Sequence, residues 1–268
     1  MTVVLIVLGI LIILFFFLIF PSPRRHCDRK RLAGLYIAHR GLHDKAANIP
    51  ENSLPAFQAA IDHGYAIEID IHVTADGEVV VFHDDDLERM CGVAGRIEDK
   101  TLAELRQLRL GNTACSIPTL QECLALVDGR VPLMIEFKCL TVAHCNRLCE
   151  AADAILQAYH GVYFVQSFFP FVLQWYRRHR RAICRGQLAT AFYHESLPKR
   201  LLGCLLFNVI ARPDFVSYDH THAGHICRRL CVLLGAFSVG WTFRNEDELE
   251  RHKKRFSTYI FEEFIPKR

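Results

Sequence analysis

Short runs of β-branched and aromatic residues alternate with longer amphipathic stretches along most of this chain. The runs have the length of buried strands, and the stretches have the length and periodicity of helices. The predicted strands are Leu35–His39, Ala66–Ile71, Val131–Phe137, Val162–Gln166, Ile183–Leu188, Pro213–Ser217, Gly235–Trp241 and Thr258–Glu262. The predicted helices include Ser53–His63, Val142–Tyr159, Phe169–Arg180, Leu197–Val209, Ala223–Leu234 and Glu246–Lys254. Such alternation is typical of an α/β fold with a parallel sheet.

One further predicted strand, Glu78–His83, breaks this alternation. Only the residues from Val73 to Gly77 separate it from the second strand, and Ala75-Asp76-Gly77 has the composition of a tight turn. Parallel neighbours need a crossover of about a dozen residues, so these two strands must form an antiparallel hairpin. The eight strands that remain are the number that a (β/α)8 TIM barrel requires.

An insertion is expected at residues 84–130, between the second and third barrel strands. It contains two predicted helices, Thr101–Leu110 and Thr119–Asp128. In a barrel, the connections that follow the strands lie at the active-site face. We therefore expect the insertion to form a lid or one wall of a substrate cleft.

The first twenty residues, Met1 to Phe20, carry no charge and are almost all apolar. Their length matches the hydrocarbon core of a bilayer. The segment has neither the basic start nor the small-residue cleavage site of a signal peptide. The predicted organisation is a transmembrane anchor over residues 1–21, a basic juxtamembrane linker over 22–34 and a barrel domain over 35–268.

The flank of the anchor predicts its orientation. Five basic residues face a single acid, Asp28, and these basic residues are Arg24, Arg25, Arg29, Lys30 and Arg31. Because basic flanks tend to stay inside, we predict a single-pass membrane protein with a cytoplasmic catalytic domain. The odd number of cysteines, 11, also favours a reducing compartment. The alternative is the opposite orientation, with the domain outside.

Composition excludes one class of partner. The net charge is +3 and the pI is about 8.3, without the concentrated basic stripe of a nucleic-acid-binding protein. Hydrophobic residues make up 51% of the chain, which supplies a sizeable core. The sequence makes no prediction of oligomeric state.

Charged residues interrupt the apolar runs at or just past the ends of predicted strands. The pairs are His39 and Arg40, Glu68 and Asp70, His83 and Asp84, and Glu136 and Lys138. An uncompensated charge at such a place costs on the order of several kcal/mol. Barrel active sites lie at the C-terminal ends of the strands, so these side chains are expected to meet there. We predict that a metal ion and a phosphate group compensate their charges.

The acids have the spacing of a metal site. Glu68 and Asp70 are two residues apart, so their side chains face the same side of a strand. Together with Glu136 they would form an oxygen-rich site suited to Mg²⁺ or Ca²⁺. The alternative is a buried salt-bridge network with Arg40 and Lys138, which is a weak source of stability.

A series of motifs extends from Ile37 to Trp241. These are Ala38-His39-Arg40-Gly41, Pro50-Glu51-Asn52-Ser53, Glu68-Ile69-Asp70, Thr74-Ala75-Asp76-Gly77, Val81-Phe82-His83-Asp84, Ile117-Pro118-Thr119-Leu120, Ile135-Glu136-Phe137-Lys138, Gln166-Ser167-Phe168 and Trp241-Thr242. In this order they resemble the glycerophosphodiester phosphodiesterase family. A lone His-Arg-Gly would be weak evidence, whereas the ordered series is specific.

The resemblance implies a barrel that uses a divalent cation to cleave glycerophosphodiesters into glycerol 3-phosphate and an alcohol. It implies that His39 and His83 are the acid–base pair, which suits a side chain that titrates near neutral pH. It further implies that Glu68, Asp70 and Glu136 hold the metal, and that Arg40 and Lys138 contact the phosphate.

Four neighbouring residues are expected to support this site, and one to bind substrate. Asp84 is expected to orient His83. Glu51 and Asn52 are expected to fix the loop after the first strand through hydrogen bonds. Trp241 is expected to form a wall or stacking surface for the substrate, and Gln166 is a weaker candidate for the same place.

The C-terminal part departs from the family pattern. Phe243-Arg244 stands before Asn245, and Phe261-Glu262-Glu263-Phe264-Ile265-Pro266 stands where a Thr-Asp-x-Pro-like sequence is usual. The departures fall where a leaving alcohol would be read, so the sequence does not choose among choline, ethanolamine, glycerol and inositol. A lysophospholipase D activity on lysophospholipids is the alternative, favoured by the anchor. A non-catalytic phosphodiester-binding sensor is a third reading, and the presence of both histidines and all three acids argues against it.

Overall fold

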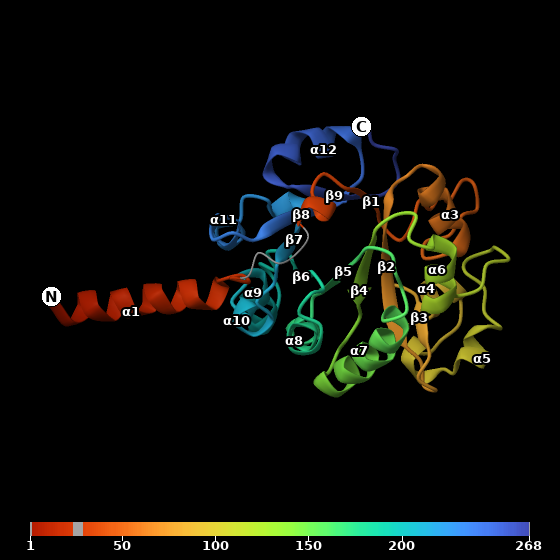
Figure 1. The fold of residues 1–268 in the computed structure, drawn as a ribbon, viewed down its shortest axis with the longest axis horizontal. Helices are drawn as coiled ribbons and strands as arrows, with labels where there is room; N and C mark the ends of the chain where they lie inside the picture. The colour runs from red at the N-terminus through yellow and green to blue at the C-terminus, as the bar shows by residue number, and fades with distance from the viewer. Residues whose placement is uncertain (1, 24–28, 268) are drawn as a thin grey trace.

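Eight parallel strands close into a barrel in this computed structural model, which describes residues 2–23 and 29–267 (Figure 1). Seven of them are β2, Ala66–Val73; β4, Leu133–Phe137; β5, Tyr163–Ser167; β6, Arg185–Ala189; β7, Phe215–Asp219; β8, Phe237–Phe243; and β9, Thr258–Phe261. The eighth, β1 (Tyr36–Ala38), pairs with both β2 and β9 and so closes the barrel. The ninth strand, β3 (Val79–Val81), is antiparallel to β2. The predicted TIM barrel and hairpin are confirmed.

The strands are covered on both sides, which explains their nearly continuous apolar sequences. All eight residues of β2 are buried, including Glu68 and Asp70. Inside the barrel, Met134, Phe215 and Ile260 belong to an apolar cluster built from several strands. A larger apolar cluster joins the strands to the surrounding helices.

Gly186 on β6 lies opposite Phe215 on β7 in the strand register. A Cβ at Gly186 would lie 1.9 Å from ring atom Cε2 of Phe215, whose side chain is fully buried. We therefore expect Gly186→Ala to lower the free energy of unfolding by about 1–3 kcal/mol through overpacking. Chemical unfolding of the detergent-solubilised chain would measure it. Gly224→Ala is the control, because no described atom lies within 4 Å of its added Cβ, and an equal effect at both positions would contradict the packing argument.

Helices surround the barrel, and one further helix, α1, projects from it (Figure 1). They are α1, Thr2–Ile19; α2, Arg29–Leu32; α3, Leu54–Asp62; α4, Glu88–Cys91; α5, Leu102–Leu105; α6, Leu120–Val127; α7, Val142–Leu156; α8, Pro170–His179; α9, Leu197–Gly203; α10, Asn208–Ala211; α11, Ile226–Leu233; and α12, Glu246–His252, with 3-10 turns at Ile97–Asp99, His220–His222 and Lys253–Arg255. Helix α3 begins as its sequence predicts, because the Ser53 side chain accepts from the Ala56 backbone N–H and proline stands in the first turn.

Two predicted helices differ from the structure. The expected helix Leu197–Val209 is divided into α9 and α10, with Leu205 in the left-handed conformation at φ 59°. Gly203 is the last residue of α9, and a Cβ there would lie 2.4 Å from the Thr190 carbonyl oxygen. The expected helix Thr101–Leu110 is only the single turn α5, capped by Thr101 and Glu104.

The segment predicted as an insertion has two parts in the structure. Helix α6 packs against α3 and α7 in the outer layer of helices. The rest builds a small apolar cluster of its own on β3, with Phe82, Leu105 and Ile117 among its members. The domain bounds 84–130 stay a prediction.

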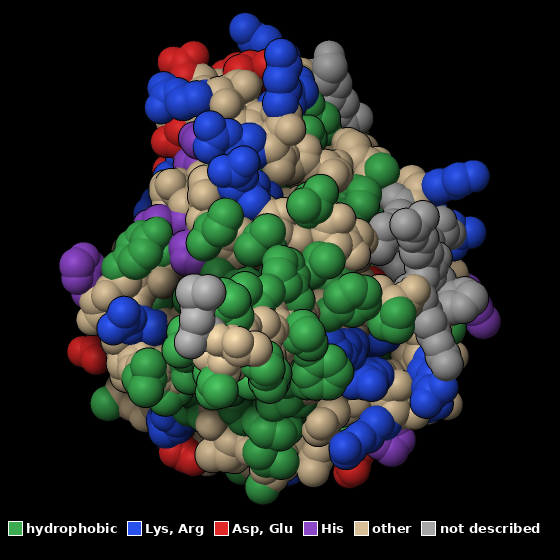
Figure 2. Space-filling view, turned by 90° about the vertical axis from the view of Figure 1, so that its left-hand side faces the viewer, with side chains coloured by type: hydrophobic (Ala, Val, Ile, Leu, Met, Phe, Trp, Pro, Cys, Tyr) green, Lys and Arg blue, Asp and Glu red, His purple; other side chains and the backbone are tan. Residues whose placement is uncertain are grey.

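Helix α1 projects away from the barrel (Figure 1), with only 6% of it buried, and its mean hydropathy is 3.4. By length and composition it is a candidate membrane span or a signal sequence. Hydrophobic side chains gather on the side of the molecule from which α1 emerges, with Lys and Arg side chains around them (Figure 2). Of the predicted linker, residues 24–28, with Arg24, Arg25 and Asp28, lie outside the described residues.

Candidate active site

A cavity of about 160 Å³ opens among the C-terminal ends of the barrel strands. The sequence predicted eight of its lining residues as site residues: His39, Arg40, Glu68, His83, Glu136, Lys138, Gln166 and Trp241. Phe168, Leu188, Thr242, Arg244 and Ile260 complete its described lining. Of the other four predicted residues, Asp70, Glu51 and Asp84 bond to members of the first set, and Asn52 bonds to Asp70.

Three buried carboxylates form the centre of the site. The parallel pairing of β2 with β4 places Asp70 directly opposite Glu136, and Glu68 follows on the same face of β2. Oxygen atoms of Glu68, Asp70 and Glu136 all lie within 4.8 Å of one another. Two cations, Arg40 and Lys138, accompany these three carboxyl groups, so the group has one negative charge in excess when all three acids are ionised. This oxygen-rich set could hold a hard metal ion.

Lys138 and Arg40 lie against the same carboxylates from different strand ends. The Lys138 ammonium is 2.9 Å from Asp70 Oδ1 and 2.6 Å from Glu136 Oε1. Arg40 Nε is 3.6 Å from Asp70 Oδ2. Arg40 has a left-handed backbone at φ 57°, and its N–H donates to Glu68 Oε2 at 3.1 Å. The loop after β1 therefore brings a backbone donor and a guanidinium to the acids.

The carboxylates titrate differently because their neighbours differ. Burial raises the pKa of Glu68, and repulsion from Asp70 and Glu136 raises it further. Burial alone would also raise the pKa of Asp70, but the charges of Lys138 and His83 lower it well below its usual value. A bound cation would favour the ionised form of every acid in the group.

His39 is oriented by a carboxylate that the sequence did not assign to the site. Its Nδ1 lies 2.5 Å from Glu262 Oε2, just after β9, and its Nε2 lies 4.0 Å from Glu68 Oε2. Burial opposes ionisation of Glu262, yet the hydrogen bond to His39 helps to lower its pKa to about 2. A proton on Nδ1 leaves Nε2 as the free ring nitrogen on the side of the metal ligands.

Arg244, which lines the cavity, bonds to the same glutamate at 2.6 Å. Sequence reasoning named Arg244 and Glu262 only as departures from the family pattern. A charged residue at the end of the last predicted strand was the available signal for Glu262, by the same rule that singled out Glu136.

His83 is held in a similar way. Its Nδ1 lies 2.6 Å from Asp84 Oδ1, the contact expected of an orienting residue. Arg89 on α4 donates to Asp84 and to Glu51, each at 2.6 Å, and this arginine was missed from the sequence. Burial lowers the pKa of His83, although the Asp70 charge opposes that shift. The insertion therefore contacts the site through an ion-pair chain.

The loop after β1 is fixed by the two residues named for that task. Arg40 Nη1 donates to Glu51 Oε1 at 2.8 Å, and Asn52 Nδ2 donates to Asp70 Oδ2 at 2.9 Å. Asn52 is buried in the left-handed conformation, at φ 51°. Both contacts join the loop to charged groups of the site.

One side of the cavity is largely apolar. The rings of Trp241 and Phe168 pack edge to face, with centroids 5.8 Å apart. Leu188 and Ile260 also line the cavity, and the buried Gln166 lies opposite Glu136 in the strand register. An apolar wall beside a charged centre suits a ligand with one ionic and one less polar end.

One other group of described residues, His72, Asp85 and Glu98, has three ligand atoms within 4.8 Å. There Arg96 donates to Glu98 at 3.1 Å and neutralises the carboxylate, and Asp85 is exposed. The buried carboxylate group at the strand ends is the better candidate metal centre.

Comparison with solved structures supports this fold. A phosphodiesterase from Oleispira antarctica, in complex with the product sn-glycerol-3-phosphate, superposes with a TM-score of 0.71 at 23% identity, over 86% of this chain and 93% of that one. A glycerophosphodiester phosphodiesterase from Thermotoga maritima superposes with a TM-score of 0.62 at 25% identity, over 85% and 94%.

Comparison of sequences gives the same family. The model of the glycerophosphoryl diester phosphodiesterase family matches residues 39–170. A glycerophosphodiester phosphodiesterase of Bacillus altitudinis is 36% identical over 188 residues, which are 66% of this chain and 68% of that protein. One of Caldanaerobacter subterraneus is 38% identical over 103 residues, 36% of this chain and 41% of that protein. Human lysophospholipase D GDPD1 is 35% identical over 129 residues, 48% of this chain and 40% of that protein.

The matched segments thus span from two fifths to about two thirds of these relatives' lengths. The family-model match over residues 39–170 includes the strand ends that carry His39, Glu68, His83 and Glu136. The chain belongs to the glycerophosphodiester phosphodiesterase family.

Proposed function

We propose that this protein is a metal-dependent phosphodiesterase that hydrolyses glycerophosphodiesters to glycerol 3-phosphate and an alcohol. The observation that carries the proposal is the convergence of three carboxylates, two cations and two histidines on one cavity. The names of the relatives support this activity, and so does the glycerol 3-phosphate in the Oleispira structure.

In the proposed mechanism, Glu68, Asp70 and Glu136 hold the metal, Mg²⁺ or Ca²⁺. When bound, the ion would stabilise negative charge on the phosphate oxygens. Arg40 and Lys138 contact the phosphate and add to this stabilisation. Both cations already lie at the carboxylates, so the phosphate would enter a site whose positive groups are in place.

The two histidines exchange protons with the substrate through Nε2. Glu262 and Asp84 hold the Nδ1 protons of His39 and His83, which leaves the other ring nitrogen of each histidine available. The neutral histidine of the pair takes a proton from the nucleophile on its free ring nitrogen, and the other histidine, protonated on both ring nitrogens, gives a proton to the leaving alkoxide. Trp241 forms the wall on which the alcohol part rests, and Gln166 lies beside it.

The test is release of glycerol 3-phosphate by the purified full chain from glycerophosphocholine and glycerophosphoethanolamine. We expect release with Mg²⁺ or Ca²⁺ and its loss when a chelator removes the metal. Re-addition of metal should restore the activity, which separates metal loss from unfolding. Release that continues in chelator would contradict the metal role, and no release from folded protein with either ion would contradict the activity.

A lysophospholipid is the second candidate substrate. Human and rat relatives named lysophospholipase D GDPD1 favour it, and so does the apolar wall of Trp241 and Phe168. The comparison to make is kcat/KM for lysophosphatidylcholine against glycerophosphocholine. A larger value for the lysolipid would make it the substrate, whereas a larger value for the soluble diester would leave the first proposal in place.

We expect Glu262→Gln to lower kcat roughly tenfold or more, but less than removal of a general acid or base, which costs about 10²–10⁴. The amide keeps the shape of Glu262 but loses the charge that favours a proton on His39 Nδ1. Glu262→Asp should recover part of the rate. The control is Glu263→Gln, at the exposed neighbouring position. If both glutamines gave wild-type rates, Glu262 would have no positioning role.

We propose that α1 is a single membrane span, followed by the linker 22–34 and the barrel domain 35–268, with the barrel cytoplasmic. The basic residues after α1 support this orientation, and so do nine free thiols among the described cysteines. Cys184 is disulfide-bonded, which is the observation that favours the opposite side. Protease protection in sealed vesicles decides: a cytoplasmic barrel is digested without detergent, and a barrel on the other side survives until detergent is added.

A further inference from the structure

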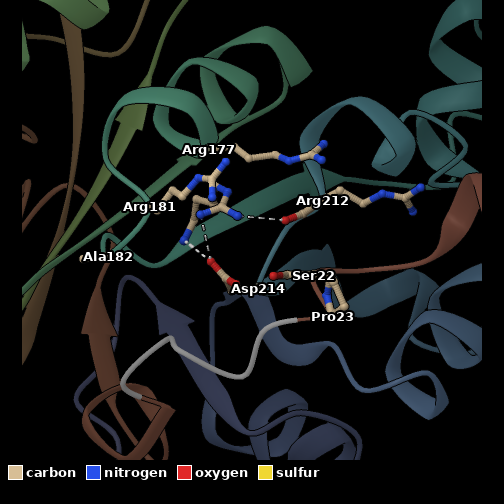
Figure 3. A pocket seen from close by; sticks show the side chains of 8 residues that line it. Ser22, Pro23, Arg177, Arg181, Ala182, Arg212 and Asp214 are labelled. Atoms are coloured by element: carbon tan, nitrogen blue, oxygen red, sulfur yellow. Dashed lines mark hydrogen bonds and ion pairs between the residues drawn. The ribbon is translucent and has the colours of Figure 1, made fainter.

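A second cavity, of about 510 Å³, lies at the opposite end of the barrel from the candidate active site (Figure 3). Arg185 is the first residue of β6 and Asp214 directly precedes β7, so the cavity lies at the N-terminal ends of the strands. Its lining residues come from α8 and the loop after it, from the starts of these strands, and from the segments that follow α1 and α10. They are Ser22, Pro23, Arg177, Arg181, Ala182, Arg185, Arg212 and Asp214.

The lining is strongly basic. Four arginines line the cavity, and Asp214 is the single acid among the described lining residues. Asp214 lies 3.4 Å from Arg185 Nη1. Burial lowers the pKa of Arg185; the Asp214 charge opposes that shift, and the charges of Arg177 and Arg181 add to it. This clustering of like charge is unfavourable for the protein alone and would be relieved by a bound anion.

Arg185 is a buried side chain with a hydrogen-bond donor that the described residues leave unpaired. It is only 5% exposed, and its Nε has no hydrogen-bond partner among the described residues. Its terminal nitrogens make long bonds to two backbone carbonyls, 3.4 Å to Ile183 and 3.3 Å to Arg212, besides the ion pair with Asp214 at 3.4 Å. A buried donor without a partner costs free energy that a ligand oxygen would recover. Guanidinium groups bind phosphate through two parallel bonds, so phosphate matches these donors.

The cavity is fixed to the end of helix α1. Ser22 and Pro23 line it and follow the helix within four residues. Arg212 donates to the carbonyl oxygens of Phe17 and Phe20, at 2.9 and 2.7 Å, and the Ser22 N–H donates to Pro213. If α1 crosses a bilayer, its last turn lies at the bilayer surface, and the arginine cavity lies at headgroup depth.

The surface beside α1 is suited to face a membrane. The Ile19 carbonyl accepts from Asn208 on α10, so α10 packs at the base of the span. Nearby, α9 and α11 expose Leu197, Ile226 and Leu233, the last at 82%. Figure 2 looks along α1 from its N-terminal end, so the hydrophobic side chains at its centre include those of the helix itself. A hydrophobic face at the base of a span continues the apolar surface that the span presents to lipid.

We propose that the arginine cavity binds the phosphate headgroup of an anionic phospholipid from the bilayer that α1 spans; this rests on the proposed membrane span. Arg185 and Arg177 hold the phosphate from the barrel and from α8, and Arg181 adds charge at the end of that helix. The bound lipid fixes the barrel on the membrane with its active site directed away from the bilayer, because the two cavities lie at opposite strand ends.

The experiment uses the full chain in a neutral detergent, with its melting temperature measured after adding phosphatidylglycerol, phosphatidylcholine or inorganic phosphate. A ligand that binds only the folded state raises this temperature. We expect a rise with phosphatidylglycerol alone. The rise should be lost in R177Q/R181Q and kept in R178Q/R251Q, which removes equal charge at exposed positions outside the cavity.

A second variant, Ala182→Glu, adds an acid to the lining without removing an arginine. It should also show no rise in melting temperature with phosphatidylglycerol, and it replaces R177Q/R181Q in the test if that variant does not fold. A rise kept in both variants would overturn the site, as would no rise with phosphatidylglycerol. An equal rise with inorganic phosphate would assign the cavity to a soluble phosphate. Carbonate extraction of membranes tests the span separately. Release of the chain would show that α1 does not span the bilayer, and the proposal would then fail because no bilayer lipid lies beside the cavity. None of these readouts depends on phosphodiesterase activity.

Discussion

Replacing His39 with alanine is expected to lower kcat for glycerophosphocholine about 10²–10⁴-fold, the usual contribution of a general acid or base. The fold should remain, because the backbone N–H of His39 still donates to the Phe261 carbonyl at 2.9 Å. The imidazole itself is 15% exposed and lines a cavity, so its loss removes little packing.

The measurement pairs steady-state kinetics with a melting temperature. His63→Ala is the control, because His63 lies at the end of α3, outside the described lining of the cavity, with an exposed side chain. We expect His83→Ala to resemble His39→Ala, since both imidazoles line the cavity. A His39→Ala enzyme within a few-fold of wild type would remove His39 from proton transfer and leave its contact with Glu262 as a structural one.

The barrel was predictable because each of its strands is a separate apolar run of the right length. Strands such as β4 are buried on both sides, so they appear as continuous runs that periodicity detects directly. The hairpin of β2 and β3 followed from chain length alone, since the connection is too short for a crossover. The division between α9 and α10 was not predictable, because it includes a left-handed backbone at Leu205, a conformation that leucine rarely adopts.

The same distinction applies to the site. Glu68, Asp70 and Glu136 were identified because burying a charge in a strand needs compensation, a rule that uses only local sequence. Arg89 and Arg244 were not identified from the sequence because they act through distant partners. Arg89 reaches Glu51, 38 positions away, and Arg244 reaches Glu262 across the ends of two strands. Such pairings depend on which loops the closed barrel brings together.

Replacing Glu136 with glutamine is expected to abolish most activity at limiting Mg²⁺ and to weaken the apparent metal affinity about 100-fold or more. Mutation of a residue that only supports a metal ligand typically lowers metal affinity or activity about 10–100-fold, so mutation of the ligand itself should lower it at least as much. Glutamine has nearly the same shape but no charge. Titrating activity against Mg²⁺ measures the effect, and Glu150→Gln on the exposed face of α7 is the control.

The same variant separates a metal site from a structural ion-pair network. Glu136 lies 2.6 Å from Lys138, so a network that holds the barrel together would lose about 3–5 kcal/mol of unfolding free energy in Glu136→Gln even with chelator present. A metal site predicts the reverse pattern. Because Glu136 also repels Glu68, the metal-free variant should unfold at nearly the wild-type denaturant concentration, and only the stabilisation produced by added Mg²⁺ should disappear.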